Sequence, residues 1–440
     1  MSNKKVAFCG FYNNKLLEIC SYFIPTGVVY CATAIQCAGW DVFTYLIEYT
    51  DYEEDFDSTI LKLINFIRKN NISYLCISAL SADFVRVREL VASTKEALPY
   101  ISIVIGGGMV SADPQFVMKN CDADYGIIGE GEISLTKLLN TLLLNKSVSN
   151  IAGLCYRYKG QVLCNLAEDI LELDLLPFPM YNLFPEYENA IKKGRIYPIL
   201  LSRSCPFSCT FCFHTSGKKY RLRSIGNVIK EIRYAIDVYD VSHLFVLDEL
   251  FGADKKQLIE FTEELRKMSN ISFNVQTRAD LINAEMLRLV KKAGCTNVSI
   301  GIESANNTVL SSMKKGVTIE FIESKLEMIL EFGVNTSGNI IIGDIAETYK
   351  SAIESIEWFR HNWKRYNLNI GHIQIYPGTY IFEYAVKNNI INKETFLLGA
   401  KNEGDFIVNI SQMNDDEYEK VRKEINKLRF FSERKKDYLF

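Results

Sequence analysis

The chain has 440 residues, of which 48% are hydrophobic and 23% are charged, and it contains only 9 prolines and 25 glycines. These proportions are typical of globular proteins and exclude a disordered, collagen-like or low-complexity chain, and the length suggests two or three domains. Lysine and arginine number 50 against 53 acidic residues, so the formal charge is -3, and we expect neither nucleic acid nor an anionic membrane as a partner. No apolar run is long enough to span a bilayer and the N-terminal residues lack a signal-peptide pattern, so we expect a cytoplasmic protein.

Residues 1 to about 148 alternate strand-like runs with amphipathic helical runs. The strand-like runs are KVAFC, WDVFTYLI, SYLCIS, ISIVIGGG and DYGII. Strands that alternate with helices at this spacing form βαβ units, in which a parallel sheet is covered on both faces. The sequence therefore predicts an α/β domain, doubly wound and Rossmann-like, with a five-stranded parallel sheet.

Regular alternation stops between residues 149 and 194. The run IAGLCYRYKGQVLC predicts a hairpin that turns at Lys159 and Gly160, and three prolines follow between residues 177 and 185. We interpret this stretch as a connector between domains.

Alternation resumes between residues 195 and 390, with six strand-like runs separated by helical ones: IYPILL, HLFVLD, SFNVQT, NVSIGI, GNIIIG and HIQIY. Six units are too few for the usual eight-stranded barrel, so we expect a partial, open (βα)6 barrel. Residues 391–440 are polar with scattered aromatics and predict a C-terminal helical tail of unknown role.

Three of the twelve cysteines form the pattern Cys-x-x-x-Cys-x-x-Cys at Cys205, Cys209 and Cys212. The pattern directly follows the first strand of the second region, and the carboxyl end of a parallel strand is where α/β folds place their chemistry. Zinc would need a fourth ligand, which His214 is able to supply, whereas an iron–sulfur cube held by only three thiolates keeps one iron open for an exogenous ligand. We expect the other nine cysteines to be reduced thiols, mainly packed as small hydrophobes: Cys9, Cys20, Cys31, Cys37, Cys76, Cys121, Cys155, Cys164 and Cys295.

The three-cysteine spacing, with Phe211 just before the third cysteine, resembles the radical S-adenosylmethionine (SAM) enzymes. The resemblance implies a 4Fe-4S cluster on Cys205, Cys209 and Cys212, whose open iron chelates SAM so that one electron cleaves SAM to a 5′-deoxyadenosyl radical. It also implies a flavodoxin or ferredoxin-type reductant. The match extends over residues 195 to about 390, with one departure at IIGDIAET, where Ile345 and Ala346 replace a proline and a glycine of the subgroup pattern.

The same resemblance points to residues around SAM. Glu303 ends NVSIGIE and is suited to the ribose hydroxyls or the methionyl ammonium, while Arg278 ends SFNVQTR and has a fork that fits a carboxylate. Asp248 and Glu249 are further candidates at a strand end. Each of these four residues also has a structural alternative, as a salt bridge or a helix cap. The backbone at Phe211 and Ile340 is expected to flank the adenine.

The first region has two glycine-rich loops at strand ends, Gly106-Gly107-Gly108 and Gly129-Glu130-Gly131-Glu132. Glycines let the backbone approach a large flat ligand, and helix N-termini offer free N–H groups. With Thr26 before the first helix and Ser78 after the third strand, the region resembles the cobalamin-binding module found before some radical enzymes. It lacks Asp-x-His-x-x-Gly, and its four histidines (His214, His243, His361 and His372) all lie elsewhere in the chain, so the resemblance implies cobalamin bound without a histidine on cobalt.

Together the two modules favour a cobalamin-dependent radical SAM methyltransferase that acts on an unactivated carbon of a small molecule or peptide. Two alternatives stay open: a radical cyclisation, ring contraction or other rearrangement without methyl transfer, and an iron–sulfur sensor that never turns over. A methylthiotransferase acting on RNA is disfavoured, because the chain has no obvious basic RNA-binding module.

Overall fold

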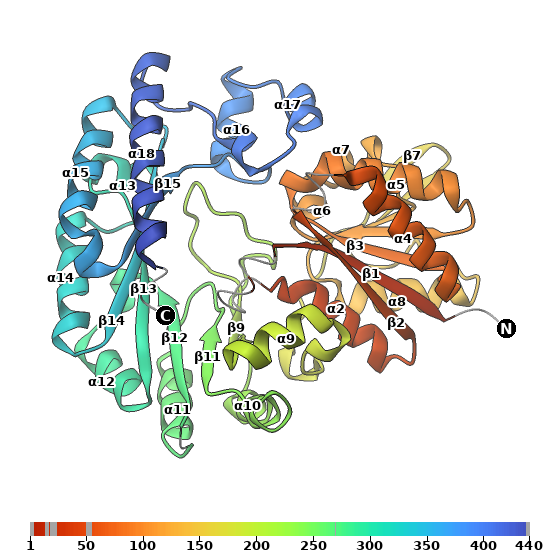
Figure 1. The fold of residues 1–440 in the computed structure, drawn as a ribbon, viewed down its shortest axis with the longest axis horizontal. Coiled ribbons are helices and arrows are strands. Elements are labelled where there is room, and N and C mark those ends of the chain that lie inside the picture. Colours follow the sequence, from red (N-terminus) through yellow and green to blue (C-terminus); the bar gives the residue numbers. More distant parts are fainter. Residues whose placement is uncertain (1–3, 14–16, 18–23, 50–54, 269, 437–440) are drawn as a thin grey trace.

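The computed structural model describes residues 4–436 except 14–16, 18–23, 50–54 and 269. Two sheets dominate it, and Figure 1 shows them side by side with β9 between them. Strand β9 (Ser202–Arg203) pairs antiparallel with β10 (Arg221–Leu222) in a separate two-stranded ladder. Among the described residues no helix combines the length and the apolar character needed to cross a bilayer.

The N-terminal sheet has seven strands in the order β2-β1-β3-β4-β5-β6-β7. Its strands are β1 (Lys5–Tyr12), β2 (Asp41–Glu48), β3 (Tyr74–Ser78), β4 (Ser102–Gly106), β5 (Tyr125–Ile127), β6 (Leu154–Tyr158) and β7 (Gln161–Cys164). The first five pair in parallel, which confirms the predicted five-stranded parallel sheet. The structure corrects its width, because β6 pairs antiparallel with β5 and β7 with β6, adding two strands at the edge.

The β6–β7 hairpin lies within the stretch that the sequence analysis interprets as a connector. Its predicted turn is confirmed: Lys159 and Gly160 stand at φ of 51° and 79° between the paired strands. Positive φ at both central residues is typical of a type I′ turn, which matches the twist of the flanking strands. The domain limits of the sequence analysis stay predictions.

Both faces of the N-terminal sheet are covered, because alternate residues of β1 enter different cores. Val6 and Phe8 pack with α2 (Thr26–Cys37) and α8 (Gly131–Leu143). Ala7, Cys9 and Phe11 enter a second core with α4 (Phe56–Asn70) and α5 (Phe84–Ala97). Side chains alternate between the faces of a strand, so this pattern is what a doubly covered sheet requires. Two short helices, α6 (Gly108–Ala112) and α7 (Pro114–Asn120), follow β4.

The second sheet has six parallel strands in the order β8-β11-β12-β13-β14-β15. Within the described part of the chain the end strands β8 and β15 do not pair, which confirms the expected partial barrel. Its strands are β8 (Ile196–Ile199), β11 (His243–Val246), β12 (Ser272–Thr277), β13 (Cys295–Glu303), β14 (Asn335–Ile342) and β15 (Leu368–His372). The covering helices are α10 (Ile225–Tyr239), α11 (Lys255–Leu265), α12 (Ala284–Lys292), α13 (Asn307–Ser312), α14 (Ile319–Glu331) and α15 (Tyr349–Tyr366). Side-chain caps define many helix starts; at α10, for example, Ser224 accepts a hydrogen bond from the Asn227 amide.

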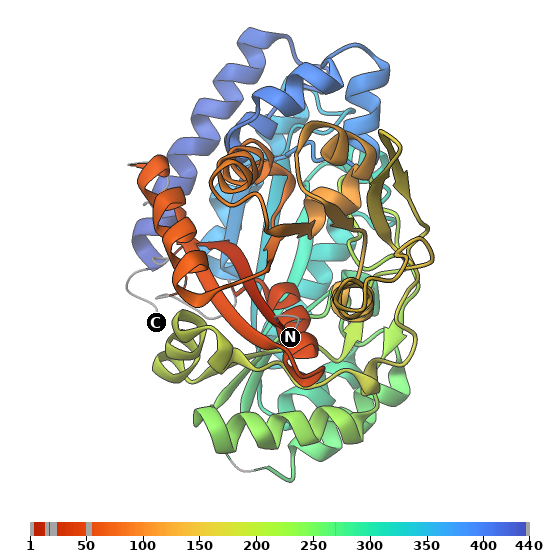
Figure 2. The same cartoon turned by 90° about the vertical axis from the view of Figure 1, so that its right-hand side faces the viewer.

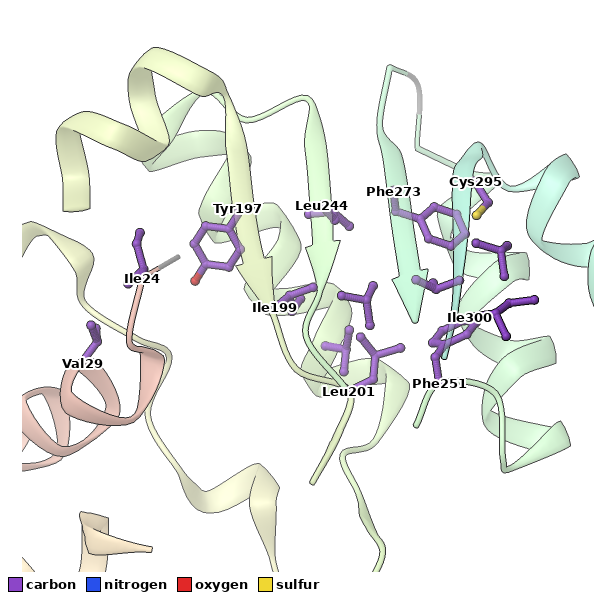
Figure 3. Packing of buried hydrophobic residues seen from close by; sticks show 14 of the residues in the cluster. Ile24, Val29, Tyr197, Ile199, Leu201, Leu244, Phe251, Phe273, Cys295 and Ile300 are labelled. Atoms are coloured by element: carbon purple, nitrogen blue, oxygen red, sulfur yellow. The ribbon is translucent and has the colours of Figure 1, made fainter. Parts of the chain in front are cut away.

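One continuous apolar core joins the two regions. Tyr197, Ile199 and Leu244 of the barrel belong to the same buried cluster as Ile24 and Val29 of the N-terminal region, as Figure 3 shows. Helix α9 (Pro185–Gly194) leads into β8 and adds Tyr187 and Ile191 to this cluster. Figure 2 shows the N-terminal sheet in front of the barrel, and the shared cluster shows that the two regions are in contact.

The tail contains the predicted helix and one further helix, and another helix ends just before residue 391. Helices α16 (Tyr380–Lys387) and α17 (Lys393–Gly399) precede the long α18 (Asp415–Lys436), which lies along α15 and β15 (Figure 1). Tyr418, Val421 and Ile425 of α18 enter the barrel core, so the tail is an integral part of the barrel.

The cysteines follow the expected pattern with one correction. Cys155 and Cys164 face each other across the β6–β7 hairpin and are disulfide-bonded, so the expectation of reduced thiols is wrong for this pair. The register set by the predicted turn at Lys159 and Gly160 places these two cysteines opposite each other, and the expectation of reduced thiols did not take this into account. Cys20 lies outside the described residues, and the remaining six of the nine are free.

Candidate active site between the two sheets

The three cysteines of the motif lie in the loop that follows β9 (Ser202–Arg203), and we call residues 204–216 the cluster loop. Cys205 and Cys209 are partly exposed and Cys212 is exposed. The hydrogen bond from Cys212 and the charges of Lys315 and Arg278 together lower the pKa of the Cys209 thiol to about 6, against the effect of burial. Burial raises the pKa of the Cys205 thiol, and the hydrogen bond to Cys209 raises the pKa of the Cys212 thiol. Thiolates are the form that binds metal, so Cys209 is the cysteine of the motif whose surroundings favour that form.

Two polar atoms in the cluster loop are buried and lack a hydrogen-bond partner among the described residues: Thr210 Oγ1 and His214 Nε2. The loop thus has a hydroxyl and a ring nitrogen without hydrogen-bond partners in the same segment as the three sulfurs. Polar groups of this kind suit the surroundings of an iron–sulfur cluster. No three His, Cys, Asp or Glu side chains of the described residues converge as a single-metal site requires. A four-iron cube is larger and takes each thiolate on a separate iron atom, so the three-cysteine loop fits it.

Left-handed backbone at non-glycine residues accumulates around this loop. Ser204, directly before Cys205, has φ of 74°, Glu303 at the end of β13 has 68°, and Lys314 has 56°. Such conformations cost of order 1 to 3 kcal/mol each and persist where the surrounding structure determines them, often at functional sites. Ser204 is held by a hydrogen bond from its hydroxyl to the Gly217 carbonyl.

Glu303 forms a buried ion pair that the sequence did not reveal. Lys315 Nζ lies 2.8 Å from Glu303 Oε1, and both side chains are at most 10% exposed. The eleven residues between them fold through α13 and return, so the pair depends on tertiary structure. A double lysine in MKKG was the only signal in the sequence.

Arg278 is buried and already holds a carboxylate. Its Nε and Nη2 each lie 3.0 Å from an oxygen of Asp280, and Nη2 also donates to the Lys315 carbonyl at 2.6 Å. Its guanidinium stacks 3.7 Å from the centroid of the Phe207 ring, and Nη1 lies 3.8 Å from Cys209 Sγ. Arg278 and Lys315 therefore place two positive charges next to the same thiolate.

Asp248 and Glu249 have different surroundings although they are adjacent. Asp248 is buried and accepts hydrogen bonds from the Leu201 amide at 2.7 Å and the Ser202 hydroxyl at 2.6 Å, while burial raises its pKa to about 6. It ties the loop after β11 to β8 and β9, which matches the structural alternative. Glu249 is more exposed, lines the cavity described next, and lies 3.4 Å from His214 Nδ1.

The two residues expected near the adenine lie on different layers. Ile340 is fully buried in β14, in register with Glu303 of β13 and Ile370 of β15. Phe211 is partly buried and packs against the buried hydrophobic residues of α16 and the tail. Their proximity to a nucleoside stays a prediction.

A cavity of about 360 Å³ lies between the N-terminal sheet and the cluster loop. All the cobalamin-directed residues of the sequence analysis line it: Thr26, Ser78, Gly106, Gly107, Gly108, Gly129, Glu130, Gly131 and Glu132. The opposite wall comes from the barrel, with Leu200, Ser202, Arg203, Ser204, Thr215, Ser216, Leu247 and Glu249.

The glycines of this cavity are spatially required. A Cβ on Gly107, whose φ is 84°, would lie 2.7 Å from the Ala79 carbonyl oxygen, and one on Gly131 would lie 2.8 Å from Cys31 Sγ. The bare backbone keeps the strand ends open to a ligand, so the cavity fits part of a large flat cofactor such as cobalamin.

The two glutamates that the N-terminal region contributes to this cavity are ion-paired. Glu130 contacts Arg203 at 2.8 Å and Arg221 at 2.5 Å, and Glu132 contacts Arg203 at 2.7 Å. Burial opposes ionisation of Glu130, but the two arginines lower its pKa overall. Sequence reasoning found the two glutamates through the glycine pattern but missed both arginines.

This fold and this site define a class: a B12-binding domain joined to a radical SAM barrel. The chain matches the family model of the Radical SAM superfamily over residues 199–359 and that of the B12 binding domain over residues 16–139. It is accordingly a cobalamin-dependent radical SAM enzyme, with a 4Fe-4S cluster, SAM and cobalamin as its cofactors.

Curated relatives carry two kinds of name. An uncharacterised methyltransferase of Pyrococcus horikoshii is 27% identical, over 76% of this chain and 74% of the relative. An anaerobic magnesium-protoporphyrin IX monomethyl ester cyclase of Rubrivivax gelatinosus is 26% identical over 81% of this chain, which spans 66% of the cyclase.

Among solved structures, the radical SAM methyltransferase TsrM of Kitasatospora setae, with tryptophan and a SAM analogue bound, superposes with a TM-score of 0.69. That match covers 87% of this chain and 77% of TsrM at 17% identity, and it shows that the fold is shared.

Proposed function

We propose that this enzyme methylates an unactivated carbon of a small molecule or peptide, with electrons from a flavodoxin or ferredoxin-type reductant. One observation carries the proposal: Ser204, adjacent to Cys205, lines the same cavity as the glycine loops of the B12-binding domain. Cluster loop and cobalamin cavity thus share a wall. When bound, the cluster and SAM supply a 5′-deoxyadenosyl radical, and cobalamin supplies the methyl group.

The residues around the cluster loop bind the cofactors and exclude water. Cys205, Cys209 and Cys212 hold the cluster, and the positive charge of Lys315 attracts the carboxylate of SAM. Arg278, whose fork holds Asp280, keeps a second positive charge beside Cys209. Glu303 accepts hydrogen bonds from SAM while Lys315 keeps its charge balanced. The glycine loops and the apolar side of the cavity exclude water from the corrin.

The experiment needs no knowledge of the substrate. Protein reconstituted with iron, sulfide and hydroxocobalamin is reduced and incubated with SAM that carries a deuterated methyl group. We expect 5′-deoxyadenosine from the radical branch and deuterium on the extracted cobalamin. Cys205→Ala/Cys209→Ala/Cys212→Ala should bind no cluster and release no 5′-deoxyadenosine, whereas Cys37→Ala, at an exposed free cysteine of α2, should behave as wild type.

The same experiment separates the rearrangement alternative, which the cyclase relative favours. Release of 5′-deoxyadenosine with unlabelled cobalamin would reject methyl transfer and support a cyclisation or other rearrangement. Absence of both products from fully reconstituted protein would reject the enzymatic proposal and support a sensor.

A further inference from the structure

The ion pairs of Glu130 and Glu132 cross between the two domains. Their arginine partners come from the two-stranded ladder of β9 and β10 (Arg221–Leu222), in which Arg203 and Arg221 are directly opposite each other. All four side chains are at most 10% exposed. Two positive and two negative charges balance, so the buried group is neutral. We call these four residues the clasp.

The Arg203 side chain contacts the B12-binding domain although its backbone belongs to the ladder of β9 and β10. Each guanidinium nitrogen of the fork holds a different glutamate, and the guanidinium also lies 5.1 Å from the centre of the Tyr30 ring on α2. A two-pronged arginine contact fixes direction as well as distance, which a lysine cannot do. The Arg203 side chain therefore fixes the position of both glutamates at the edge of the cobalamin cavity.

The clasp is almost part of the cluster loop. Only Ser204 separates Arg203 from Cys205, and two residues of chain span at most about 7 Å. Ser204 is itself held in its left-handed conformation by Gly217. The Glu130–Glu132 loop is therefore connected to the first cluster ligand through Arg203 and Ser204.

Arg221 reinforces the arrangement from the other strand. Beyond Glu130, it donates to the Ile170 carbonyl at 2.8 Å and to the Ser216 carbonyl at 2.7 Å, at the far end of the cluster loop. Glu130 also accepts a hydrogen bond from the Ile170 amide. Both ends of the cluster loop are thus connected to one glutamate of the B12-binding domain.

A second contact holds the loop after Cys212. A Cβ on Gly108 would lie 3.8 Å from Thr215 and 3.9 Å from the Phe213 ring, and one on Gly378 would clash with that ring at 2.6 Å. The ring is therefore packed between the glycine loop after β4 and the segment after β15.

We propose that Arg203 is a positioning residue which, held by Glu130 and Glu132, sets one fixed separation between the iron–sulfur cluster and cobalamin. Its role is distinct from ligand binding, because its fork is already occupied by the two glutamates. The proposal rests on the presence of both cofactors and not on methyl transfer. Its test therefore measures the separation of the two cofactors and not the rate of the reaction.

The test uses full-length protein loaded with the cluster and hydroxocobalamin and reduced so that both centres carry an unpaired electron. Their spin–spin interaction, measured by electron paramagnetic resonance, reports the separation of the two cofactors. Wild type should give one narrow distance distribution. Arg203→Met/Glu132→Gln, which leaves the neutral Arg221–Glu130 pair in place, should broaden or shift that distribution and weaken hydroxocobalamin binding at least threefold.

The matched control removes a buried pair that stays inside the barrel. Arg223 lies 2.6 Å from Glu231, with both side chains at most 7% exposed. Arg223→Met/Glu231→Gln should lose comparable thermal stability and keep the wild-type distance distribution. A clasp variant whose distribution equals that of this control would overturn the proposal, as would a broad distribution in wild type.

A milder variant keeps the proposal testable if the double variant does not fold. Arg203→Lys retains the charge but not the fork, so we expect a folded protein with an intermediate broadening. Hydrogen exchange of the cofactor-free protein provides a second readout, in which Arg203→Lys should accelerate exchange in residues 130–132 and 204–216. A wild-type distance distribution together with wild-type exchange in Arg203→Lys would overturn the proposal.

Discussion

At the scale of single residues, the site depends on buried charges that compensate each other. Lys315 and Glu303 are both at most 10% exposed, and Lys315 also lowers the pKa of the Cys209 thiol. Removing one member of a buried pair leaves an unpaired charge and costs about 3 to 5 kcal/mol, far more than a surface pair contributes. Lys315 therefore serves both folding and cofactor binding.

We expect Lys315→Met to lower the free energy of unfolding by about 3 kcal/mol and to reduce SAM binding at least tenfold, because Glu303 and the SAM carboxylate both lose their cation. Lys315→Arg keeps the charge and should lose much less. Lys350→Met, on the exposed face of α15, is the control. Urea unfolding and equilibrium binding of SAM check this; equal losses in the methionine and arginine variants would show that charge is not the cause.

At the scale of elements, the loops after the parallel strands decide the site, and their geometry is demanding. Gly107 has φ of 84° and ψ of -166°, a conformation open essentially to glycine alone. The loop after β14 contains the departure at Ile345 and Ala346, and it is closed by hydrogen bonds from the Ala346 amide to Asp344 Oδ1 and from the Glu347 amide to the Asp344 carbonyl. A well-formed turn thus replaces the one that the subgroup builds from proline and glycine.

Gly107→Ala should lower the free energy of unfolding by about 1 to 3 kcal/mol and weaken hydroxocobalamin binding, because its Cβ pushes the loops after β3 and β4 apart. Gly226→Ala is the control, since a Cβ there meets no atom within 4 Å on α10 and should be neutral or stabilising. Chemical unfolding and absorbance titration with hydroxocobalamin measure both effects. Undiminished cofactor affinity in Gly107→Ala would contradict the assigned role of this loop.

Glu347 makes the same loop sensitive to pH. Burial raises the pKa of its carboxyl from 4.5 to about 7. The folded state therefore binds the proton more tightly than the unfolded state, so this contribution to stability is complete below pH 4.5 and is lost as the pH rises to about 7. Glu347→Gln should consequently be more stable than wild type at pH 8, by about 1 to 3 kcal/mol, with the difference vanishing near pH 4.5.

Thermal unfolding of wild type and Glu347→Gln between pH 4.5 and 8 measures this difference. The control is Glu331→Gln at an exposed position of α14. Its stability should differ from that of wild type by the same amount at every pH in this range. A pH-independent difference for Glu347→Gln would mean that the carboxyl does not titrate in this range.

At the scale of the whole molecule, a single apolar core passes from the B12-binding domain through the barrel to the C-terminal helix. The clasp adds a polar connection at the point where the two cofactor sites share a wall. Helix α18 packs on β15, the edge strand of the barrel, and His372 of that strand lies 3.1 Å from Asn426. The tail therefore covers an edge that an open barrel would leave exposed.

Ile425→Ala should cost about 2 to 5 kcal/mol, because Ile425 is fully buried in the barrel core although it lies in the C-terminal tail. Lys423→Ala, on the exposed side of α18, should change the stability by less than about 0.5 kcal/mol. Differential scanning calorimetry compares the two. A tail that unfolds in a separate, earlier transition would contradict its place in the common core.

Local pattern in the sequence was sufficient for the elements and for the three cysteines. Strand and helix periodicities depend on neighbouring residues, so they predicted both parallel sheets, the Lys159–Gly160 turn and the C-terminal helix. Cys205, Cys209 and Cys212 lie within eight residues, and glycine loops are visible as composition. Contacts between side chains and between separate elements left no such signal: the Cys155–Cys164 disulfide, the addition of the predicted hairpin to the edge of the sheet and the Lys315–Glu303 pair were missed.

By itself the sequence determined the class of enzyme, because the residues that form a three-thiolate cluster site and a glycine-rich cofactor loop lie close together in the chain as short motifs. Only the tertiary structure decided how the two sites are joined. Arg203 and Glu132 are 71 positions apart, and their ion pair forms because the β9–β10 ladder carries the arginine into the other domain. A motif specifies which atoms are present, whereas the packing of two sheets specifies which charges must neutralise each other once water is excluded.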